Sequence, residues 1–580
     1  MKDLKFILSY LKYFKKDLII TLTLVIVETV FELIIPFLMS DIIDKGIEQK
    51  DVNQIWISGS LIVACAIISL ITGHFFSRSN ARLVTKFSHK LRSEVFKKIQ
   101  TYSFANIDHF ESSSLITRVT NDVQIMQNTL AGGIRPICRS PIMLLMGVGL
   151  SFAMAPSIAW VFLCAIPVLG IILFLVVKRT ASKYSIIQKS IDDVNRVVRE
   201  NVNAIRTVKS YVREEFEKEK FNKANTNVMD VTKYTFRVAQ LNQPSFQLVM
   251  YAVTVLILYL GSLAIHYDGL GVGTLSALLS YILQILNSLM MFSNVFLLVN
   301  RSFASSTRLC EVFREEPTIK ENPDGIKEVK NGTIDFKDVS FKYKENSMEY
   351  VLSDINIHID AGMSVGILGG TGSAKSTFVS LILRLYDTTK GEVLIDGKNV
   401  KDYELKNLRD SISIVLQNNV LFSGTIRDNL KWGKKDATDE ELNHALAMSC
   451  ADEFIGRLPG GLDYDLGQGG VNVSGGQKQR LCIARSLLKN PKIIIFDDST
   501  SACDMETERK ILTNIRSLKG LTNIIIAQRI TSVMGADMII IIDNGKIEDV
   551  GTHKELLERN EIYQDLYNTQ LGGVSDAANC

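Results

Sequence analysis

The chain has 580 residues, a formal net charge of +3 and 47% hydrophobic residues. This length exceeds that of one ordinary domain, so we expect at least two folding units. The near-balanced charge gives no electrostatic argument for a nucleic-acid partner. None of the eight cysteines forms a Cys-x-x-Cys pair, so the sequence indicates neither a zinc site nor a disulfide framework.

Residues 1–16 predict an amphipathic helix that lies on a membrane surface. Lysines alternate there with leucine, isoleucine and phenylalanine, and no cleavable signal pattern is visible. The helix is expected to lead into a membrane domain over residues 17–305.

Six apolar segments in residues 17–305 reach the length of about 20 residues that a membrane-spanning helix needs. Their expected bounds are Leu18–Ser40, Ile55–Phe75, Ile134–Met154, Ile158–Val177, Phe246–Ile265 and Val272–Val299. Two of the connections are long, and these carry 8 and 14 Lys and Arg residues, whereas the three short connections together carry two lysines. By the positive-inside tendency, the long connections and both termini are expected on the cytoplasmic side.

The long connections, Ser77–Gly133 and Lys178–Ser245, keep helical apolar spacing almost to their middles. We therefore expect each to consist of helices that continue out of the membrane and turn back. The turns, near Asn106–Leu115 and Ile205–Glu214, are predicted to carry short helices that contact the soluble domain.

Five residues in the spans are candidate substrate contacts. Glu28 and Glu32 lie one helical turn apart in the first span, and a carboxylate inside a membrane suggests a cavity or an ion pathway. The alternative is that they pair with arginines of the third span as structural charges. Asn287, Met290 and Met291 suit an adaptable binding wall in the sixth span, although such residues also pack helices together.

After a linker over residues 306–330, residues 331–570 predict a soluble α/β domain, followed by a tail over residues 571–580. The expected strand Met363–Leu368 runs into a glycine-rich turn and then into an apolar helix. This order indicates a phosphate-binding loop in which backbone N–H groups hold the phosphates of ATP. The loop residues are Gly369, Gly370, Thr371, Gly372, Ser373, Ala374, Lys375, Ser376 and Thr377.

The same pattern assigns individual roles around the loop. Lys375 is expected to meet the β- and γ-phosphates, and Ser376 to supply a hydroxyl ligand to Mg²⁺. Asp497 follows the expected strand Ile493–Phe496, at the strand end where open α/β sheets bind ligands, and is expected to hold Mg²⁺.

Further motifs resemble those of ABC exporter half-transporters. The run Ser474, Gly475, Gly476 and Gln477 resembles the family's signature sequence, with Val473 in place of its leading leucine. The resemblance covers essentially the whole chain. It implies an all-α six-helix membrane domain followed by an α/β ATPase domain, with ATP and Mg²⁺ as cofactors.

The resemblance also implies roles for residues outside these motifs. Tyr343 would stack on adenine, and Gln417 would act at the Mg²⁺ site together with Ser376 and Asp497. Residues 501–504 resemble the family's D-loop. Two domains of this kind sandwich two ATP molecules, so the signature residues of this chain would contact the nucleotide of a partner chain.

Four further positions depart from the family pattern. Asp498 stands in place of a glutamate that activates water, Gln528 in place of the switch histidine, Gln468 in place of a glutamate before the signature, and Ala374 in place of a glycine. With Gln417, Asp498 and Gln528 make up the expected catalytic group. An aspartate is shorter than a glutamate, and a glutamine cannot become cationic, so we expect weak hydrolysis at this site.

This combination resembles the degenerate-site half of bacterial heterodimeric multidrug exporters. It implies export of amphipathic molecules, with lipid as surroundings and a second half-transporter that supplies the complete glutamate and histidine. It further implies a multi-pass protein of a bacterial cell membrane. The alternatives are a lipid flippase, a homodimeric exporter in which aspartate and glutamine suffice, and an ATP-gated channel or regulatory subunit.

Overall fold

The computed structural model describes residues 2–499 and 503–572. Its contacts divide the chain into two compact units, residues 1–101 with 111–315, and residues 102–110 with 316–580. Residues 501 and 502 of the expected D-loop and residues 573–580 of the expected tail lie outside the described residues.

The first unit is helical. Its helices are α1 (Lys2–Leu8), α2 (Lys15–Asp41), α3 (Val52–Gln100), α5 (Ser112–Thr117), α6 (Val123–Met154), α7 (Pro156–Asn203), α8 (Ile205–Ser210), α9 (Glu214–Ala239), α10 (Asn242–Asp268) and α11 (Val272–Arg314). The six long helices α2, α3, α6, α7, α10 and α11 each contain one predicted span. In the described residues, five stretches are long and apolar enough to cross a membrane, and α7 adds the shorter apolar stretch Pro156–Ile172.

Local chemistry sets several of the helix ends. The Asp51 side chain accepts hydrogen bonds from two backbone N–H groups in the first turn of α3, which satisfies donors that have no partner inside the helix. Pro156 is the first residue of α7, where a backbone N–H would have no partner inside the helix, so its absence in proline has no cost. Gly269 ends α10 at φ +69°, a conformation that a residue with a Cβ adopts at a cost.

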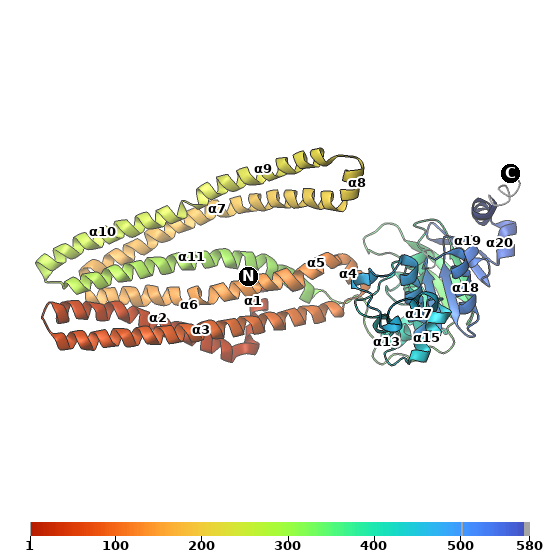
Figure 1. The fold of residues 1–580 in the computed structure, drawn as a ribbon, viewed down its shortest axis with the longest axis horizontal. Helices are drawn as coiled ribbons and strands as arrows, with labels where there is room; N and C mark the ends of the chain where they lie inside the picture. The colour runs from red at the N-terminus through yellow and green to blue at the C-terminus, as the bar shows by residue number, and fades with distance from the viewer. Residues whose placement is uncertain (1, 500–502, 573–580) are drawn as a thin grey trace. The chain divides into compact units, whose positions relative to one another are not determined.

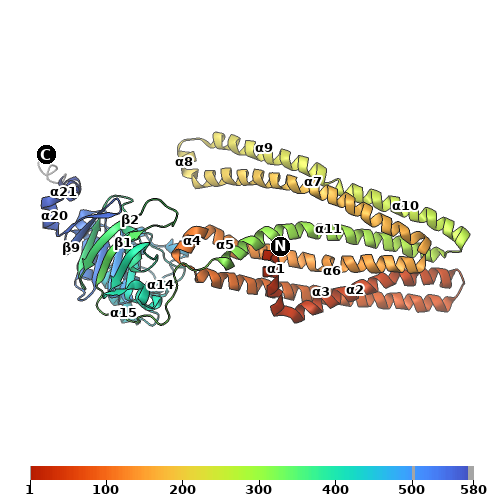
Figure 2. The ribbon, with the colours of Figure 1, turned by 180° about the vertical axis from the view of Figure 1, so that it is seen from behind.

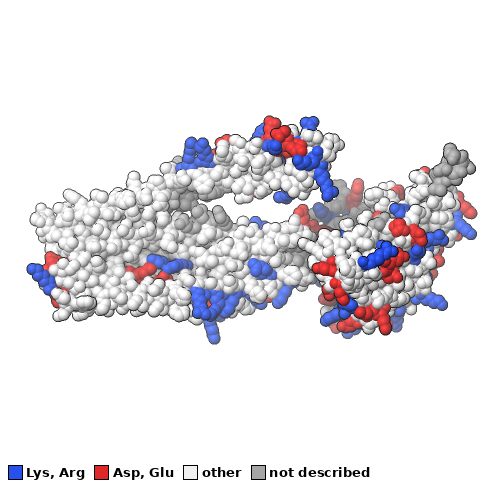
Figure 3. Space-filling view, viewed as in Figure 1, with Lys and Arg blue, Asp and Glu red and all other residues white. Residues whose placement is uncertain are grey.

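The long helices run side by side in pairs, α2 with α3, α6 with α11, and α7 with α9 (Figures 1 and 2). The predicted turn helix of the second long connection is present as α8, between α7 and α9. Figure 3 shows a broad uncharged surface over α10 and the adjoining part of α7, and charged side chains gathered around α8. This distribution agrees with helices that begin in lipid and continue into water.

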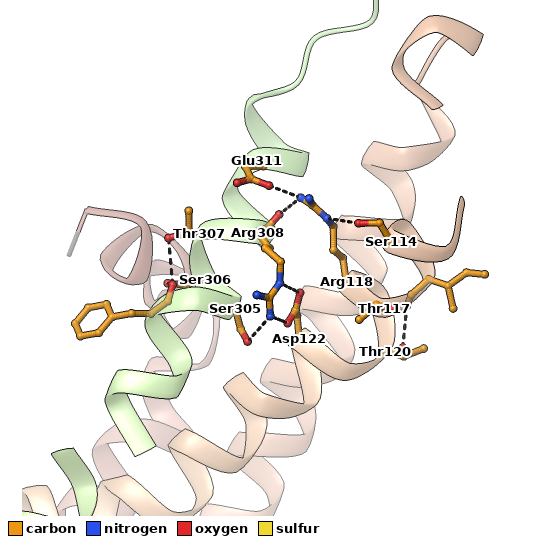
Figure 4. Close-up of polar contacts among 12 residues, drawn as sticks. Ser114, Thr117, Arg118, Thr120, Asp122, Ser305, Ser306, Thr307, Arg308 and Glu311 are labelled. Carbon is orange, nitrogen blue, oxygen red and sulfur yellow. Dashed lines mark hydrogen bonds and ion pairs between the residues drawn. The ribbon is translucent and has the colours of Figure 1, made fainter. Parts of the chain in front are cut away.

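A charged cluster fastens α11 to the helical turn before α6. Asp122 is fully buried, and Arg308 of α11 holds it with both sides of its guanidinium group, one bond measuring 2.8 Å from Nε to Oδ2. Arg118 donates to the Arg308 carbonyl at 2.5 Å and pairs with Glu311 at 2.8 Å (Figure 4). Separating the two elements would leave the buried carboxylate of Asp122 without its counter-charge, which is costly. The cluster therefore keeps α11 fixed against the turn that precedes α6.

The N-terminal helix α1 lies against the end of α11. Ile7 is fully buried, and the rings of Phe6 and Tyr10 pack on Phe313 at 5.6 and 5.9 Å between centroids. Part of its apolar face is therefore covered by protein, while the lysines of this segment remain exposed. Its position on a membrane surface stays a prediction.

The second unit contains two sheets. The larger sheet has the order β10-β9-β3-β8-β7-β6 and is parallel except for β10, and the smaller has the antiparallel order β2-β1-β4-β5 (Figures 1 and 2). The strands are β1 (Ile334–Phe341), β2 (Leu352–Ile359), β3 (Ser364–Leu368), β4 (Lys390–Ile395), β5 (Lys398–Asn399), β6 (Ile412–Val415), β7 (Ile493–Asp497), β8 (Thr522–Ile526), β9 (Met538–Asp543) and β10 (Lys546–Gly551).

The helices of this unit surround the sheets. They are α4 (Phe104–Phe110), α12 (Lys375–Ile382), α13 (Leu405–Ser411), α14 (Ile426–Leu430), α15 (Asp439–Met448), α16 (Asp452–Ile455), α17 (Gly475–Leu488), α18 (Met505–Arg516), α19 (Ile530–Val533), α20 (His553–Arg559) and α21 (Glu561–Tyr567). Strands β3, β7 and β8 are buried along their whole length, as the central strands of a parallel sheet with two covered faces must be.

Helix α4, from the first long connection, belongs to the second unit. Asp108 accepts a hydrogen bond from the Tyr386 hydroxyl at 2.6 Å, and Phe104 packs on the same ring. Asn106 donates to the Glu316 carbonyl at 2.9 Å. The prediction of a short helix at this turn that contacts the soluble domain is thereby confirmed.

Candidate nucleotide-binding site

The phosphate loop joins β3 to α12, the strand–turn–helix order that the sequence predicts. Gly369 is required by a close approach, because a Cβ at this position would lie 2.1 Å from the Ile542 carbonyl oxygen of β9. Gly372 has φ +85°, and Ala374 has φ +74° even though it carries a Cβ. The backbone therefore adopts a left-handed conformation at the position where a glycine is expected, and Ala374 bears the strain.

Lys375 lies folded over the loop. Its ammonium donates to the carbonyl oxygens of Gly369 and Gly370 at 2.9 and 2.7 Å and to the Ser373 hydroxyl at 3.3 Å. Burial lowers the pKa of this lysine, and the nearby carboxylates of Asp497 and Asp498 partly oppose that shift. A cation held on the inner side of the loop is placed to bind phosphate oxygens.

Asp497 ends β7 beside the first turn of α12. Its Oδ1 accepts a hydrogen bond from the Ser376 hydroxyl at 2.9 Å, so the two expected magnesium ligands lie together. Burial raises the pKa of Asp497, and the bond from Ser376 opposes the rise. A hydroxyl and a carboxylate are hard oxygen donors of the kind that Mg²⁺ binds alongside phosphate and water, so these residues fit the ion.

The three expected catalytic residues meet at one carboxylate. Asp498 Oδ2 accepts a hydrogen bond from Gln528 Nε2 at 2.8 Å and one from Gln417 Nε2 at 3.2 Å. Asp498 has φ +47°, and its N–H bonds to the Ile526 carbonyl of β8. Burial raises the pKa of the Asp498 carboxyl, while the bonds from the two amides act against that rise.

Tyr343 stands half-exposed next to the loop. Its hydroxyl shares a 2.8 Å hydrogen bond with Thr377 Oγ1, and its ring packs edge-on against Phe341 and Tyr386. A ring fixed at both its edge and its hydroxyl can offer an exposed face to a base, and stacking of Tyr343 on adenine remains a prediction. Tyr386, which also contacts α4, carried no signal in the sequence.

The signature segment begins α17. Ser474 and Gln477 form a capping box, in which the Ser474 N–H donates to Gln477 Oε1 at 2.9 Å and the Ser474 hydroxyl accepts from the Gln477 N–H at 3.4 Å. Nothing lies within 4 Å of the place where a Cβ of Gly475 would be. In the described part of the chain, no hydrogen bond joins Ser474–Gln477 to the phosphate loop.

The predicted substrate residues fall into two groups. Glu28, 5% exposed, pairs with Arg135 of α6, and Glu32 pairs with Arg139 at 2.5 Å. The structure thus shows the ion pairs that were the alternative interpretation, and substrate contact by these carboxylates stays a prediction.

The second group lies on α11. Asn287 and Met291 are exposed and Met290 is half-buried. Among the described side chains, no hydrogen bond or ion pair links these three residues to Glu28 or Glu32. Their role as a binding wall also stays a prediction.

Comparison with known proteins identifies the family. The family description "ABC transporter transmembrane region" matches residues 18–289, and "ABC transporter" matches residues 352–501. A Bacillus subtilis (strain 168) protein named ABC transporter ATP-binding protein YfiB is 38% identical over 565 residues, covering 97% of this chain and 98% of that protein. The chain is a member of the ABC transporter family.

Other relatives of this ABC transporter carry more specific names. The "ATP-dependent lipid A-core flippase" of Haemophilus influenzae (strain 86-028NP) is 30% identical, covering 93% of this chain and 92% of that protein. The "Putative multidrug export ATP-binding/permease protein YgaD" of B. subtilis is also 30% identical, covering 98% and 100%. A solved bacterial Atm1-family ABC exporter with ATP bound superposes with a TM-score of 0.82 at 22% identity, covering 96% of this chain and 99% of that one.

These findings fix the transporter's general character. It has a helical, multi-pass membrane domain of the ABC exporter type followed by an α/β nucleotide-binding domain, and it is a transport ATPase. The solved structure agrees with the described fold over nearly the whole of both chains.

Proposed function

We propose that this transporter exports amphipathic molecules from the bacterial cytoplasm as one half of a heterodimer whose own nucleotide site hydrolyses ATP slowly. The observation that carries the proposal is the surroundings of Asp498. Its carboxylate is bound by the amides of Gln417 and Gln528, and neither amide can take up a proton from it. The signature segment, by contrast, keeps an intact capping box, and there is open space at the position that a Cβ of Gly475 would take.

The chain's own residues would then hold ATP rather than turn it over. Lys375 and the N–H groups of the phosphate loop bind the phosphates, and Ser376 with Asp497 holds Mg²⁺, which draws charge from the β- and γ-phosphate oxygens when bound. Gln528 donates a hydrogen bond to the γ-phosphate. Asp498, one methylene shorter than glutamate, holds the attacking water too far from the phosphorus for rapid hydrolysis.

The partner's site would be the active one. Ser474, Gly475 and Gly476 stand at the N-terminus of α17, where free N–H groups and the helix dipole favour a phosphate. With no bond to their own phosphate loop, they are available to the nucleotide of a partner that carries glutamate and histidine. Closing two such sites would draw the cytoplasmic ends of the helices together and turn the cavity outward.

The heterodimer is tested by ATPase assays on this chain alone and together with the product of the neighbouring gene, if that gene encodes a second half-transporter. We expect turnover in the pair only, loss of turnover when the partner's catalytic glutamate is replaced by glutamine, and little change with Asp498→Asn in this chain. Turnover by the lone chain that disappears with Asp498→Asn would instead establish a homodimer in which aspartate suffices.

A lipid flippase is the second candidate, because the Haemophilus relative bears that name. Both candidates place the protein in the cell membrane with cytoplasmic termini, as the charge of the long connections favours. Sealed vesicles separate the two: an exporter accumulates an amphipathic dye against its gradient, whereas a flippase moves a labelled lipid between leaflets and leaves the dye in place. A channel or regulatory subunit would only dissipate a dye gradient.

A further inference from the structure

The last described turn of the chain, Asn568–Gly572, reaches back to the nucleotide site. Gln570 Oε1 accepts a hydrogen bond from the Ile530 N–H at 2.9 Å, and Gln570 Nε2 donates to the Gln528 carbonyl at 3.0 Å. One side-chain amide thus binds two backbone groups of residues 528–530, which we call the switch segment.

The backbone of the switch segment explains why one amide can make both bonds. Arg529 is extended, with φ −95° and ψ +129°, so the carbonyl before it and the N–H after it face the same side. The Gln570 amide pairs with these groups as the N–H and C=O of one residue in a neighbouring parallel strand would. It also satisfies the first N–H of α19, a helix whose own preceding residue makes no side-chain cap bond.

The far side of the switch segment is held by a different set of contacts. Glu508, nearly buried on α18, accepts a 2.6 Å hydrogen bond from Ser532 and lies 3.7 Å from an Arg529 nitrogen. The segment is therefore fixed from two directions, and only the Gln570 side involves the end of the chain.

We propose that Gln570 is a positioning residue of the nucleotide site: by fixing the switch segment, it holds the Gln528 amide against Asp498 and the γ-phosphate of ATP. This inference rests on the proposed contact between Gln528 and ATP. Loss of the two Gln570 bonds lets the segment move, and ATP then leaves the site faster although no group that touches it has changed.

The test is Gln570→Glu, which keeps the acceptor for Ile530 and removes the donor to the Gln528 carbonyl. The measurement is the release rate of trinitrophenyl-ATP from the full-length chain in lipid nanodiscs, with EDTA in place of Mg²⁺ so that no hydrolysis occurs. We expect release about three- to tenfold faster at pH 8, the equivalent of one lost hydrogen bond. A glutamate has a pKa of about 4.3, raised here by the facing carbonyl, so the rate should return toward wild type as the pH falls toward about 5 and the carboxyl donates again.

Two further variants separate positioning from general stability. Gln570→Met keeps the length of the side chain and should speed release at every pH. Gln564→Glu is the matched control, because Gln564 donates a similar 2.8 Å bond to the Leu557 carbonyl between α21 and α20, away from the switch segment. Its release rate should stay at the wild-type value throughout.

The proposal is overturned if Gln570→Glu releases the nucleotide at the wild-type rate at all pH values, or if it changes in parallel with Gln564→Glu. Release is measured without turnover, so a lone chain that hydrolyses ATP rapidly would contradict the heterodimer and leave the pH comparison intact. A wild-type chain that does not bind the analogue contradicts the nucleotide site itself, and both proposals with it.

Discussion

Two segments of the nucleotide-binding unit, the phosphate loop and the signature segment, are proposed to bind phosphate, and they differ in how many of their polar groups already form hydrogen bonds within the chain. At the phosphate loop, Lys375 binds two carbonyls of the loop and Asp498 is held by two amides. At the signature segment, the Ser474 hydroxyl and N–H are hydrogen-bonded to Gln477 of the same helical turn, and Gly475 faces open space.

The difference is the one that we expect of a chain that holds ATP well and hydrolyses it slowly, as proposed above. Binding needs a cation and backbone donors, which the phosphate loop supplies. Hydrolysis needs a base that reaches the attacking water and a side chain that stabilises the developing charge. At these positions the chain has Asp498, which is shorter than a glutamate, and Gln528, which is neutral. The signature segment retains what a partner's site requires.

Ser474→Ala should have the largest effect, because it removes the N-cap of the signature segment, which we propose to serve the active site of the partner. Loss of a serine cap costs about 1 kcal/mol of helix stability. If the segment serves a partner's nucleotide, ATPase activity of the assembled pair should fall by about tenfold or more, while trinitrophenyl-ATP binding to the lone chain is unchanged. Thr438→Ala removes the same kind of cap from α15 and serves as the control; equal losses in both variants would show that only helix stability is involved.

Asp498→Glu changes the chain's own nucleotide site, which we propose to be weakly hydrolytic, and should have an intermediate effect. The added methylene brings the carboxylate nearer to the attacking water, so hydrolysis by the lone chain should rise about three- to tenfold. Adding Gln528→His should raise it further. As a control, Asp549→Glu lengthens a carboxylate that pairs with Arg559 outside the site, and if Asp498→Glu gains no more than this control, the length of Asp498 is not what limits turnover.

Ala374→Gly should have the smallest effect. An L-residue at φ +74° destabilises the folded chain by about 1 kcal/mol. Glycine removes this strain, but it also raises the conformational entropy of the unfolded chain, which destabilises the fold by about 0.4–1 kcal/mol. We expect ATP affinity to rise by no more than about threefold, measured by nucleotide titration. Asn544→Gly relieves a similar backbone conformation away from the loop; a gain in ATP affinity there as large as at Ala374 would contradict a local effect.

The fold could be predicted because membrane-spanning helices and buried parallel strands both require hydrophobic runs that can be recognised in the sequence. A span must be apolar over about 20 residues, and all six predicted spans fall within long helices of the structure. The ion pairs inside the spans could not be predicted, because Glu28 and Arg135 lie 107 positions apart in the sequence. From the sequence alone, Glu28 and Glu32 could each have paired with an arginine of the third span or faced a cavity.

The site was predictable where a motif is local. Spacing indicated that Ser376 and Asp497 would meet at the end of β7, and the structure joins them. The sequence also marked Ala374 as a departure from the family pattern, and the left-handed backbone at this residue became visible only in the structure. Gln570 gave no signal, since a glutamine in a polar stretch near the end of a chain acquires meaning only when the fold brings it to Gln528.

The placement of residues 102–110 has a consequence for the chain's connectivity. These residues fold with the nucleotide-binding unit, so the chain crosses between the two units three times, after residues 101, 110 and 315. A protease that cuts once, after residue 101 or after residue 110, leaves residues 111–315 of the helical unit covalently joined to residues 316–580. Cutting between residues 315 and 316 leaves α4 connected at both ends to the helical unit and held to residues 316–580 by noncovalent contacts, among them those of Phe104, Asn106 and Asp108.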